Sequence, residues 1–222
     1  MFHDLKLGDE AGRLSAVARY DILDTPAEPQ FDNIASLLKT IFKAPIALIS
    51  VIDDKRQWYK ACDGLDVGEI PRDMAFCNYT IRSSDILAIE DTTLDPRFAD
   101  HPLVVGSPHL RSYLGIPLTS PDGYNIGTIC IVDTQPRTFG PDDYATLRQF
   151  AAVAISQFEL RQIASRDGLT GMATRRAFTE AAERELSRFL RHGQPVTLVL
   201  FDLDRFKSCL LYTSPSPRDK RQ

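Results

Sequence analysis

The chain has 222 residues, of which 43% are hydrophobic, and its formal net charge at pH 7 is −4. This composition excludes an intrinsically disordered chain, and the scattered basic residues argue against a nucleic-acid partner, because nucleic-acid-binding proteins gather basic residues in a patch or stripe. The sequence has no signal peptide and no apolar run near the roughly 18 residues of a spanning helix, so we expect a cytoplasmic protein with no membrane partner.

The predicted domain begins with two helices and a hairpin. Apolar residues recur at helical spacing from Glu10 to Leu23 and again from Pro29 to Lys43. The β-branched run from Ile46 to Ile52 is typical of a buried strand. A short polar turn separates it from a second strand, Gln57 to Ala61, so we expect the two strands to pair antiparallel.

The next part of the chain completes the predicted sheet. Residues 62–85 carry a loop and a short helix, and we expect them to form a lid over a pocket. A strand is predicted from Ile86 to Glu90, and a long connection, residues 91–108, follows it. Two more strands, residues 111–119 and 126–133, flank an Asp-Gly turn suited to a hairpin. Two helices and about five strands indicate an α+β domain, an antiparallel sheet flanked by helices.

Several strings in this region resemble one subgroup of the GAF family. They are ILDTPAEPQFD, PIALISVID, RQWYKACDGL, EIPRDMAFCNYTI, DPRFADHPLVVGSP and GTICIVD. They spread over residues 13–161, and the resemblance implies a sensory domain of the kind found ahead of sensor kinases and diguanylate cyclases. Its ligand does not follow from the sequence. The residues expected to line a sensor pocket, on the concave face of the sheet and the lid, are Val51, Trp58, Cys77, Tyr113 and Ile129.

A long helix is predicted after the last strand, from Pro141 to Ser165. Pro141 suits a first helical position, and Asp142 and Asp143 suit the positive end of a helix. The stretch has no internal proline or glycine and would extend roughly 37 Å. Its first half fits an amphipathic helix packed on the preceding domain, whereas its second half leads into a motif.

That motif, RDGLTGMATRRAF at residues 166–178, resembles the opening of a GGDEF (diguanylate cyclase) domain. The family pattern is Asp-x-Leu-Thr-Gly-Leu-x-Asn-Arg-Arg-x-Phe. Seven positions match it at fixed spacing: Asp167, Leu169, Thr170, Gly171, Arg175, Arg176 and Phe178. Met172 stands for Leu and Thr174 for Asn.

A second family motif follows a charged helix, residues 175–190. Val196 to Phe201 is an apolar run typical of a buried strand, and the string DLDRFK at its end resembles the family motif Asp-x-Asp-x-Phe-Lys. Carboxylates at a strand end are hard oxygen ligands suited to Mg²⁺ on a nucleotide phosphate. The resemblance implies Mg²⁺ as cofactor and GTP as substrate, with Asp202 and the backbone carbonyl of Leu203 on the metal, and Phe206 and Lys207 on the phosphates.

The family match ends after Lys207. Residues 208–222, SCLLYTSPSPRDKRQ, show no apolar periodicity and resemble translated sequencing-adapter read-through, so we expect them to be an artefact of gene assembly. No Gly-Gly-(Asp/Glu)-Glu-Phe signature occurs in the chain. We therefore expect a GAF domain over residues 1–160, a truncated α/β start of a GGDEF domain over 161–207, and no cyclase activity in this chain.

The family mechanism implies a homodimer, because a diguanylate cyclase joins two GTP molecules into cyclic di-GMP and each of two facing domains brings one. We expect the helix at residues 141–165 to pair with its copy in parallel. The expected seam consists of Leu147, Ala151, Ala154 and Phe158. Arg161 falls where an apolar residue is expected, which weakens this seam.

Two other classes of function remain open. The first is a non-enzymatic GAF module that acts on a partner protein through its pocket and helix. The second is an enzyme within the GAF fold, such as a thiol-dependent methionine sulfoxide reductase using Cys62, Cys77 or Cys130. The four cysteines form no CxxC pair, which predicts neither a disulfide framework nor a zinc site and favours buried structural thiols.

Overall fold

The structure is a computed structural model that describes residues 4–193, 195–202 and 204. The chain divides into two compact units, Met1–Ala181 and Ala182–Gln222. The division falls inside a helix, and the predicted domain boundaries at residues 160 and 207 stay predictions.

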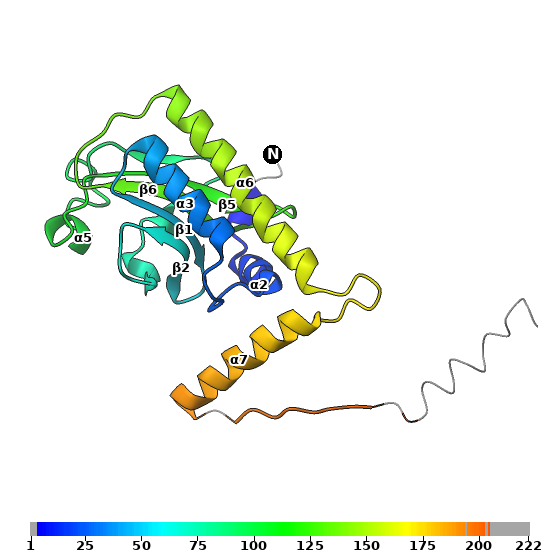
Figure 1. The fold of residues 1–222 in the computed structure, drawn as a ribbon. Helices are drawn as coiled ribbons and strands as arrows, with labels where there is room; N and C mark the ends of the chain where they lie inside the picture. The colour runs from blue at the N-terminus through cyan, green and yellow to red at the C-terminus, as the bar shows by residue number, and fades with distance from the viewer. Residues whose placement is uncertain (1–3, 194, 203, 205–222) are drawn as a thin grey trace, which may run out of the picture. The chain divides into compact units, whose positions relative to one another are not determined.

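A six-stranded antiparallel sheet forms the centre of the first unit (Figure 1), with the order β3-β2-β1-β6-β5-β4. Its strands are β1 (Ile46–Ile52), β2 (Arg56–Asp63), β3 (Glu69–Pro71), β4 (Leu87–Ile89), β5 (Ser112–Thr119) and β6 (Asn125–Asp133). The two predicted hairpins are confirmed, since β1 pairs with β2 and β5 with β6 in antiparallel register. The sequence missed β3, whose three residues lie at an edge of the sheet and are too few for a pattern.

Long helices cover one face of the sheet (Figure 1). They are α2 (Glu10–Tyr20), α3 (Pro29–Phe42) and α6 (Pro141–Ser165), and a short α1 (Asp4–Leu7) precedes them. Pro29 and Pro141 occupy first-turn positions, and the Asp143 carboxylate accepts the Gly140 N–H at 2.8 Å, which fixes the start of α6. The core on this helix side includes Phe31, Leu38, Ile49, Leu114 and Phe158.

Short elements cover the opposite face and form the lid. They are a single 3₁₀ turn η1 (Arg72–Met74), α4 (Cys77–Thr80) and α5 (Pro102–Val105), and the edge strand β3 leads into them. The sequence predicted α4 as a short helix but left α5 inside a connection. A separate hydrophobic cluster lies beneath these elements and includes Ile46, Leu48, Phe76, Phe98 and Cys130.

The helix α6 has the bounds that the sequence predicted, but its expected dimer seam is wrong. Leu147, Ala151, Ala154 and Phe158 are all buried in the core of their own domain, with exposures of 0%, 8%, 0% and 1%. The apolar stripe faces β5 and α3, so packing on the domain uses the side chains that a dimer would need. The apolar residues of α6 that remain exposed are Val153, Leu160 and Ile163.

The DGLTG motif forms the loop between α6 and α7 (Arg175–His192). One carboxylate oxygen of Asp167 accepts the N–H groups of Leu169 and Thr170 and the Thr170 hydroxyl, at 3.2, 2.9 and 2.7 Å. Gly171 has φ of 69°, a value at which a glycine is favoured. The spacing of Asp, Thr and Gly in the motif is therefore the spacing that one tight turn requires.

The predicted strand at Val196–Phe201 is absent from the described residues of the second unit. This segment is extended but unpaired, and Leu198, Leu200 and Phe201 are 72%, 91% and 88% exposed. A strand without a neighbour has no partner for its backbone groups, so the apolar run cannot form a sheet by itself.

Candidate functional site

A cavity of about 210 Å³ lies between the sheet and the lid. Its walls come from β1, β2, β5 and β6 on one side and from the lid on the other. Most of its lining side chains are aliphatic or aromatic, and the lining set is Ile46, Leu48, Gln57, Tyr59, Leu65, Val67, Ile70, Phe76, Cys77, Leu103, Pro108, Leu110, Tyr113, Cys130 and Val132. Val67 is 49% exposed, so the cavity reaches the surface on the β2–β3 side.

A small polar cluster interrupts the apolar wall around the Cys77 sulfur. The Gln57 amide donates to Cys77 Sγ at 3.1 Å, the Tyr113 hydroxyl donates to it at 3.4 Å, and Cys130 Sγ lies 3.8 Å away. The Thr80 hydroxyl lies 2.7 Å from the Tyr113 hydroxyl and holds that ring in place. All five residues are buried, so their hydrogen bonds are shielded from water.

These contacts separate the pKa values of the two thiols. Burial raises the pKa of the Cys77 thiol, but hydrogen bonds from Cys130, Thr128, Tyr113 and Gln57 outweigh burial and lower it to about 7. The hydrogen bond to Cys77, together with burial, raises the pKa of the Cys130 thiol well above its usual range. The contacts therefore favour a thiolate on Cys77 over a thiolate on Cys130.

Aromatic rings hold the lid over this cluster. The ring of Phe76, next to Cys77, stacks on Phe98 with centroids 4.5 Å apart and lies 5.7 Å from the Tyr113 ring. His101 packs edge-on against Phe76 at 4.9 Å. Since α4 and α5 have four residues each, these ring contacts and not helix length fix the position of Cys77.

Of the five predicted pocket residues, Cys77 and Tyr113 line the cavity and three do not. Val51, Trp58 and Ile129 pack in the core on the helix side. Every residue of β1 and β6 is buried, so no polar alternation marks which face of these strands meets the lid. Because the side-chain period of a strand is two, choosing a residue one position away puts it on the wrong face.

The sequence prediction missed Cys130, Gln57 and Tyr59 as cavity residues. Cys130 pairs with Leu48 in the register of β6 and β1, on the same face of the sheet. Tyr59 is followed by a bulge, where Ser50 opposes Tyr59 but Ile49 opposes Ala61, and this leaves Lys60 unpaired and turned to the helix side. No residue pattern signals such a bulge.

A charged cluster on the helix side joins β2 to α6. Lys60 is buried, and its ammonium group donates to the Glu28 carboxylate at 2.6 Å and to the Pro26 carbonyl at 2.8 Å. The same Glu28 oxygen accepts from Arg161 of α6 at 2.8 Å. Arg161 also donates to the carbonyl of Asp21, at 3.2 Å. The residue that interrupts the apolar stripe of α6 is therefore a fixed contact of the GAF-like domain.

The predicted GGDEF site residues do not form a metal site in the part of the chain that the structure describes. Asp202 is exposed, and Leu203, Phe206 and Lys207 lie outside the described residues. No group of three or more histidine, cysteine or acidic residues gathers to hold a metal among residues 4–193, 195–202 and 204. Since Mg²⁺ binds through several oxygen ligands held together, Asp202 as placed here does not fit the ion.

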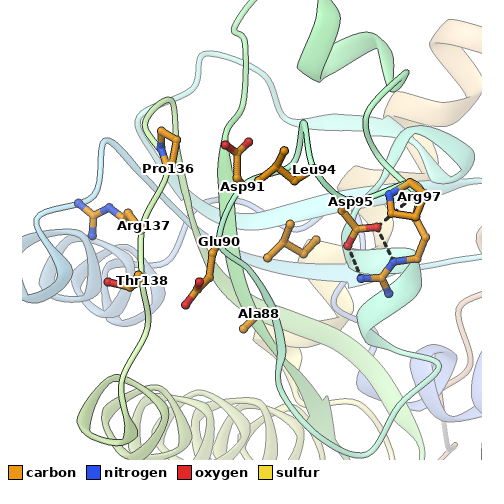
Figure 2. Close-up of a pocket in the computed structure, with 11 residues that line it drawn as sticks. Ala88, Glu90, Asp91, Leu94, Asp95, Arg97, Pro136, Arg137 and Thr138 are labelled. Carbon is orange, nitrogen blue, oxygen red and sulfur yellow. Dashed lines mark hydrogen bonds and ion pairs between the residues drawn. The ribbon is translucent and has the colours of Figure 1, made fainter.

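A second, more open hollow lies along the edge strand β4, and Figure 2 shows the residues that line it. It is lined by Ala88, Ile89, Glu90, Asp91, Leu94, Asp95, Pro96, Arg97, Pro136, Arg137 and Thr138. Its cations are already engaged within the domain, because Arg97 bends back onto Asp95 at 2.6 Å and Arg137 pairs with Asp133 at 2.6 Å. The enclosed cavity is therefore the better candidate for a small-molecule site.

The family comparisons agree with this architecture. The GAF domain profile matches residues 26–157, more than half of the chain, and the chain belongs to the GAF domain family. The profile described as diguanylate cyclase, GGDEF domain, matches residues 164–209. The predicted order, a GAF domain followed by the start of a GGDEF domain, is confirmed. No helix within the described residues is long and apolar enough to cross a membrane.

Individual relatives extend the picture. The cyclic di-GMP phosphodiesterase PA2567 of Pseudomonas aeruginosa is 38% identical over 199 residues, 88% of this chain and 33% of that protein. The chain thus spans about a third of its curated relative. The GAF domain of an Acinetobacter phosphoenolpyruvate-protein phosphotransferase has a TM-score of 0.53 at 18% identity, covering 70% of this chain and 96% of its own.

An enzyme is also among the similar structures. Free methionine-R-sulfoxide reductase of Neisseria meningitidis, solved with its substrate, has a TM-score of 0.52 at 22% identity, covering 70% of this chain and 89% of its own. At this identity the likeness shows the fold alone. The GAF and GGDEF regions and the phosphodiesterase relative together support a role in cyclic di-GMP signalling.

Proposed function

We propose that the GAF domain is a sensor whose cavity state is passed through α6 to the cyclic di-GMP chemistry of a larger parent protein. The observation that carries this proposal is the position of β2. Its residues Gln57 and Tyr59 line the cavity, and the neighbouring Lys60 joins Glu28, which also binds Arg161 of α6.

In this proposal, the coupling works through a displacement of the strand β2 that also changes the contacts of the Glu28 carboxylate. A change in the cavity that shifts Tyr59 also shifts Lys60, because the two are adjacent at the bulge in β2. Lys60 and Arg161 share the same Glu28 oxygen, so a displaced Lys60 alters the hold on α6. Since α6 leads directly into the GGDEF match at residue 164, its position is the natural output of the sensor.

The output we propose is a diguanylate cyclase that forms cyclic di-GMP from two GTP with Mg²⁺, on the strength of the DGLTG and DLDRFK motifs. The second candidate is hydrolysis of cyclic di-GMP, which the name of the Pseudomonas relative favours. Both candidates place the chemistry in the parent protein, and this 222-residue chain is expected to perform neither.

The test is an assay of the full-length parent protein with GTP and Mg²⁺, and separately with added cyclic di-GMP. Formation of cyclic di-GMP that is lost in Asp202→Ala supports the cyclase, and disappearance of added cyclic di-GMP supports the second candidate. If Glu28→Gln and Arg161→Gln each leave the rates of both reactions unchanged, the proposed path from the cavity to α6 is contradicted. Arg148→Gln, on the same helix but paired with the exposed Asp85, is the matched control.

We also propose a homodimer through α6, with a seam different from the predicted one. Val153, Leu160 and Ile163 are 48%, 58% and 70% exposed and are spaced seven and three residues apart, which is the spacing of a coiled-coil stripe. Analytical ultracentrifugation of the chain should show a dimer that is weakened by Leu160→Glu and not by Ser156→Glu. A monomer at high micromolar concentration would contradict this proposal.

A further inference from the structure

The cavity contains a reactive arrangement that neither the family nor the GGDEF output explains. Two thiols from distant parts of the chain, Cys77 of the lid and Cys130 of the central strand β6, meet with sulfurs 3.8 Å apart. Both are buried from the outer surface, yet both line a cavity with a volume several times that of a water molecule.

We propose that Cys77 and Cys130 are a peroxide-reactive pair, which a hydroperoxide entering the cavity converts to a disulfide. The reading of this disulfide as the signal rests on the proposed sensor function. The thiol chemistry itself rests only on the cavity and the two sulfurs.

The surroundings of Cys77 make it the attacking sulfur. Its sulfur accepts hydrogen bonds from Gln57 at 3.1 Å and from Tyr113 at 3.4 Å. Hydrogen bonds to the charged form of a group favour that form, so these two neutral donors stabilise a thiolate on Cys77. The Gln57 amide is held by a second hydrogen bond, to the Ser50 hydroxyl at 2.9 Å. The lowered pKa of Cys77 and the raised pKa of Cys130 agree with this division into attacking and resolving thiols.

The reaction balances with the hydroperoxide as the two-electron oxidant. The Cys77 thiolate attacks the terminal oxygen, the O–O bond breaks, and the leaving alkoxide or hydroxide takes a proton to become an alcohol or water. Cys77 then carries a sulfenic acid. The Cys130 sulfur attacks the Cys77 sulfur, the S–O bond breaks, and the released hydroxyl takes the Cys130 proton and leaves as water.

Forming the bond requires a movement that the lid is suited to make. A disulfide holds its sulfurs at about 2.0 Å, so the observed 3.8 Å must shorten. Cys130 lies in the middle of the sheet, whereas Cys77 begins the four-residue α4. We therefore expect α4 to move toward the sheet, and this would disturb the stack of Phe76 on Phe98.

Cys62 provides an internal control. It is half-buried near the end of β2, whereas Gln57, which contacts Cys77, lies near the start of that strand. The Cys62 thiol donates a hydrogen bond to the Leu65 carbonyl at 3.4 Å, and burial raises its pKa. Among the residues that the structure describes, no donor stabilises a Cys62 thiolate and no second thiol forms a contact with Cys62 like the one between Cys77 and Cys130. It is expected to react with peroxide more slowly than Cys77, by about tenfold or more, because reactivity follows the thiolate fraction.

The test treats the full chain carrying Cys209→Ser with a small excess of hydrogen peroxide, then blocks free thiols under denaturing conditions. Mass spectrometry of non-reduced peptides should find Cys77 linked to Cys130 by a disulfide. Cys62 should carry the blocking group, which shows that its thiol stayed reduced. Cys130→Ser should stop at a sulfenic acid on Cys77 that a dione reagent traps, and Cys62→Ser should behave as the parent chain. Both thiols recovered in the blocked form, or a link through Cys62, would overturn the proposal.

The outcomes separate this inference from the proposed function. The mass measurement on the Cys209→Ser chain, which keeps Cys62, Cys77 and Cys130, decides the thiol chemistry even if Cys130→Ser or Cys62→Ser does not fold. If the disulfide forms but cyclic di-GMP turnover in the parent protein does not change, the sensor function fails and the thiol chemistry stands. If turnover responds to another ligand while both thiols stay reduced, the thiol proposal fails alone.

Discussion

The two faces of the sheet are covered in different ways. On the helix side, α2, α3 and α6 have 11, 14 and 25 residues and bury a continuous apolar core. On the lid side, α4 and α5 have four residues each, and the cavity lies beneath them. One sheet therefore has a face packed by long elements and a face roofed by short ones.

This difference separates stability from response. A long helix moves as a whole and contacts many side chains, so its packing resists local change. A single helical turn held by ring contacts can shift without unfolding the domain, and elements that respond to ligands come from such low-stability parts of a structure. The cavity side is expected to carry the response, and the helix side is expected to carry most of the free energy of unfolding.

The largest expected effect compares two neighbours on β1. Ile49 faces the helix side and is fully buried, whereas Leu48 faces the lid and lines the cavity. Ile49→Ala should lower the free energy of unfolding by about 3–4 kcal/mol, since it opens a void in a packed core. Leu48→Ala enlarges a cavity that already exists, so we expect about 2 kcal/mol.

Urea unfolding of the two variants, followed by circular dichroism, measures this difference. Equal losses of stability would mean that the lid side is packed as tightly as the helix side, and the contrast between the faces would fail. The two substitutions lie at adjacent positions of the same strand, so each serves as the control for the other.

The order of elements could be predicted from the sequence because long helices and paired strands have strong local patterns. The bounds of β1 and α6 match the predicted ranges because Pro141 and the turn after Ile52 mark their ends. The lid could not be predicted in the same way, since β3 and α5 have three and four residues and owe their form to what they contact.

The cavity could be predicted only in part. Cys77 was found because the lid segment was identified, but the meeting of Cys77 with Cys130 depends on the register of β6 and on the path of the lid. These are tertiary facts with no local pattern. The prediction of the dimer seam was wrong for a related reason. An apolar stripe on a helix indicates that one face of the helix is covered, but it does not indicate whether the same domain or a second copy covers it.

A second prediction concerns the charged cluster that links the helix side to β2. Glu28→Ala would leave the Lys60 ammonium, with a side chain 0% exposed, without its carboxylate. We expect a loss of about 2–3 kcal/mol, below the usual loss for a fully buried pair because Glu28 is itself 24% exposed. Glu69→Ala is the matched control, as its partner Arg56 keeps two other carboxylates, and should lose less than about 1 kcal/mol.

Chemical denaturation of both variants tests this prediction. A loss for Glu28→Ala no larger than for Glu69→Ala would show that Lys60 finds enough compensation in the Thr25 hydroxyl and the Pro26 carbonyl, at 3.0 and 2.8 Å. The link between β2 and α6 would then be weak, and coupling between cavity and helix would need another route.

The smallest expected effect lies where the two faces meet, at Glu10. Its carboxylate accepts from Arg13 of α2 at 2.8 Å and from Arg72 of the lid at 2.6 Å. The hydrogen bond from Arg13 lowers the Glu10 pKa from 4.5 to about 2, and Arg72 adds to this effect against the opposing influence of burial. Glu10 therefore joins the stable face to the responsive one through a single carboxylate.

The sign of the pH dependence follows from this lowered pKa. The folded state binds the Glu10 proton less readily than the unfolded state, so the stabilisation is fully present above about pH 4.5 and is lost as the pH falls toward about 2. Because the side chain is 47% exposed, we expect only about 1 kcal/mol at pH 7. In urea unfolding, Glu10→Gln should lose this amount at pH 7 and progressively less between pH 4.5 and pH 3, whereas Asp54→Asn in the exposed β1–β2 turn should stay within about 0.5 kcal/mol of the parent chain. If Glu10→Gln lowers the free energy of unfolding by the same amount at every pH, the contribution of Glu10 comes from its packing and not from its charge.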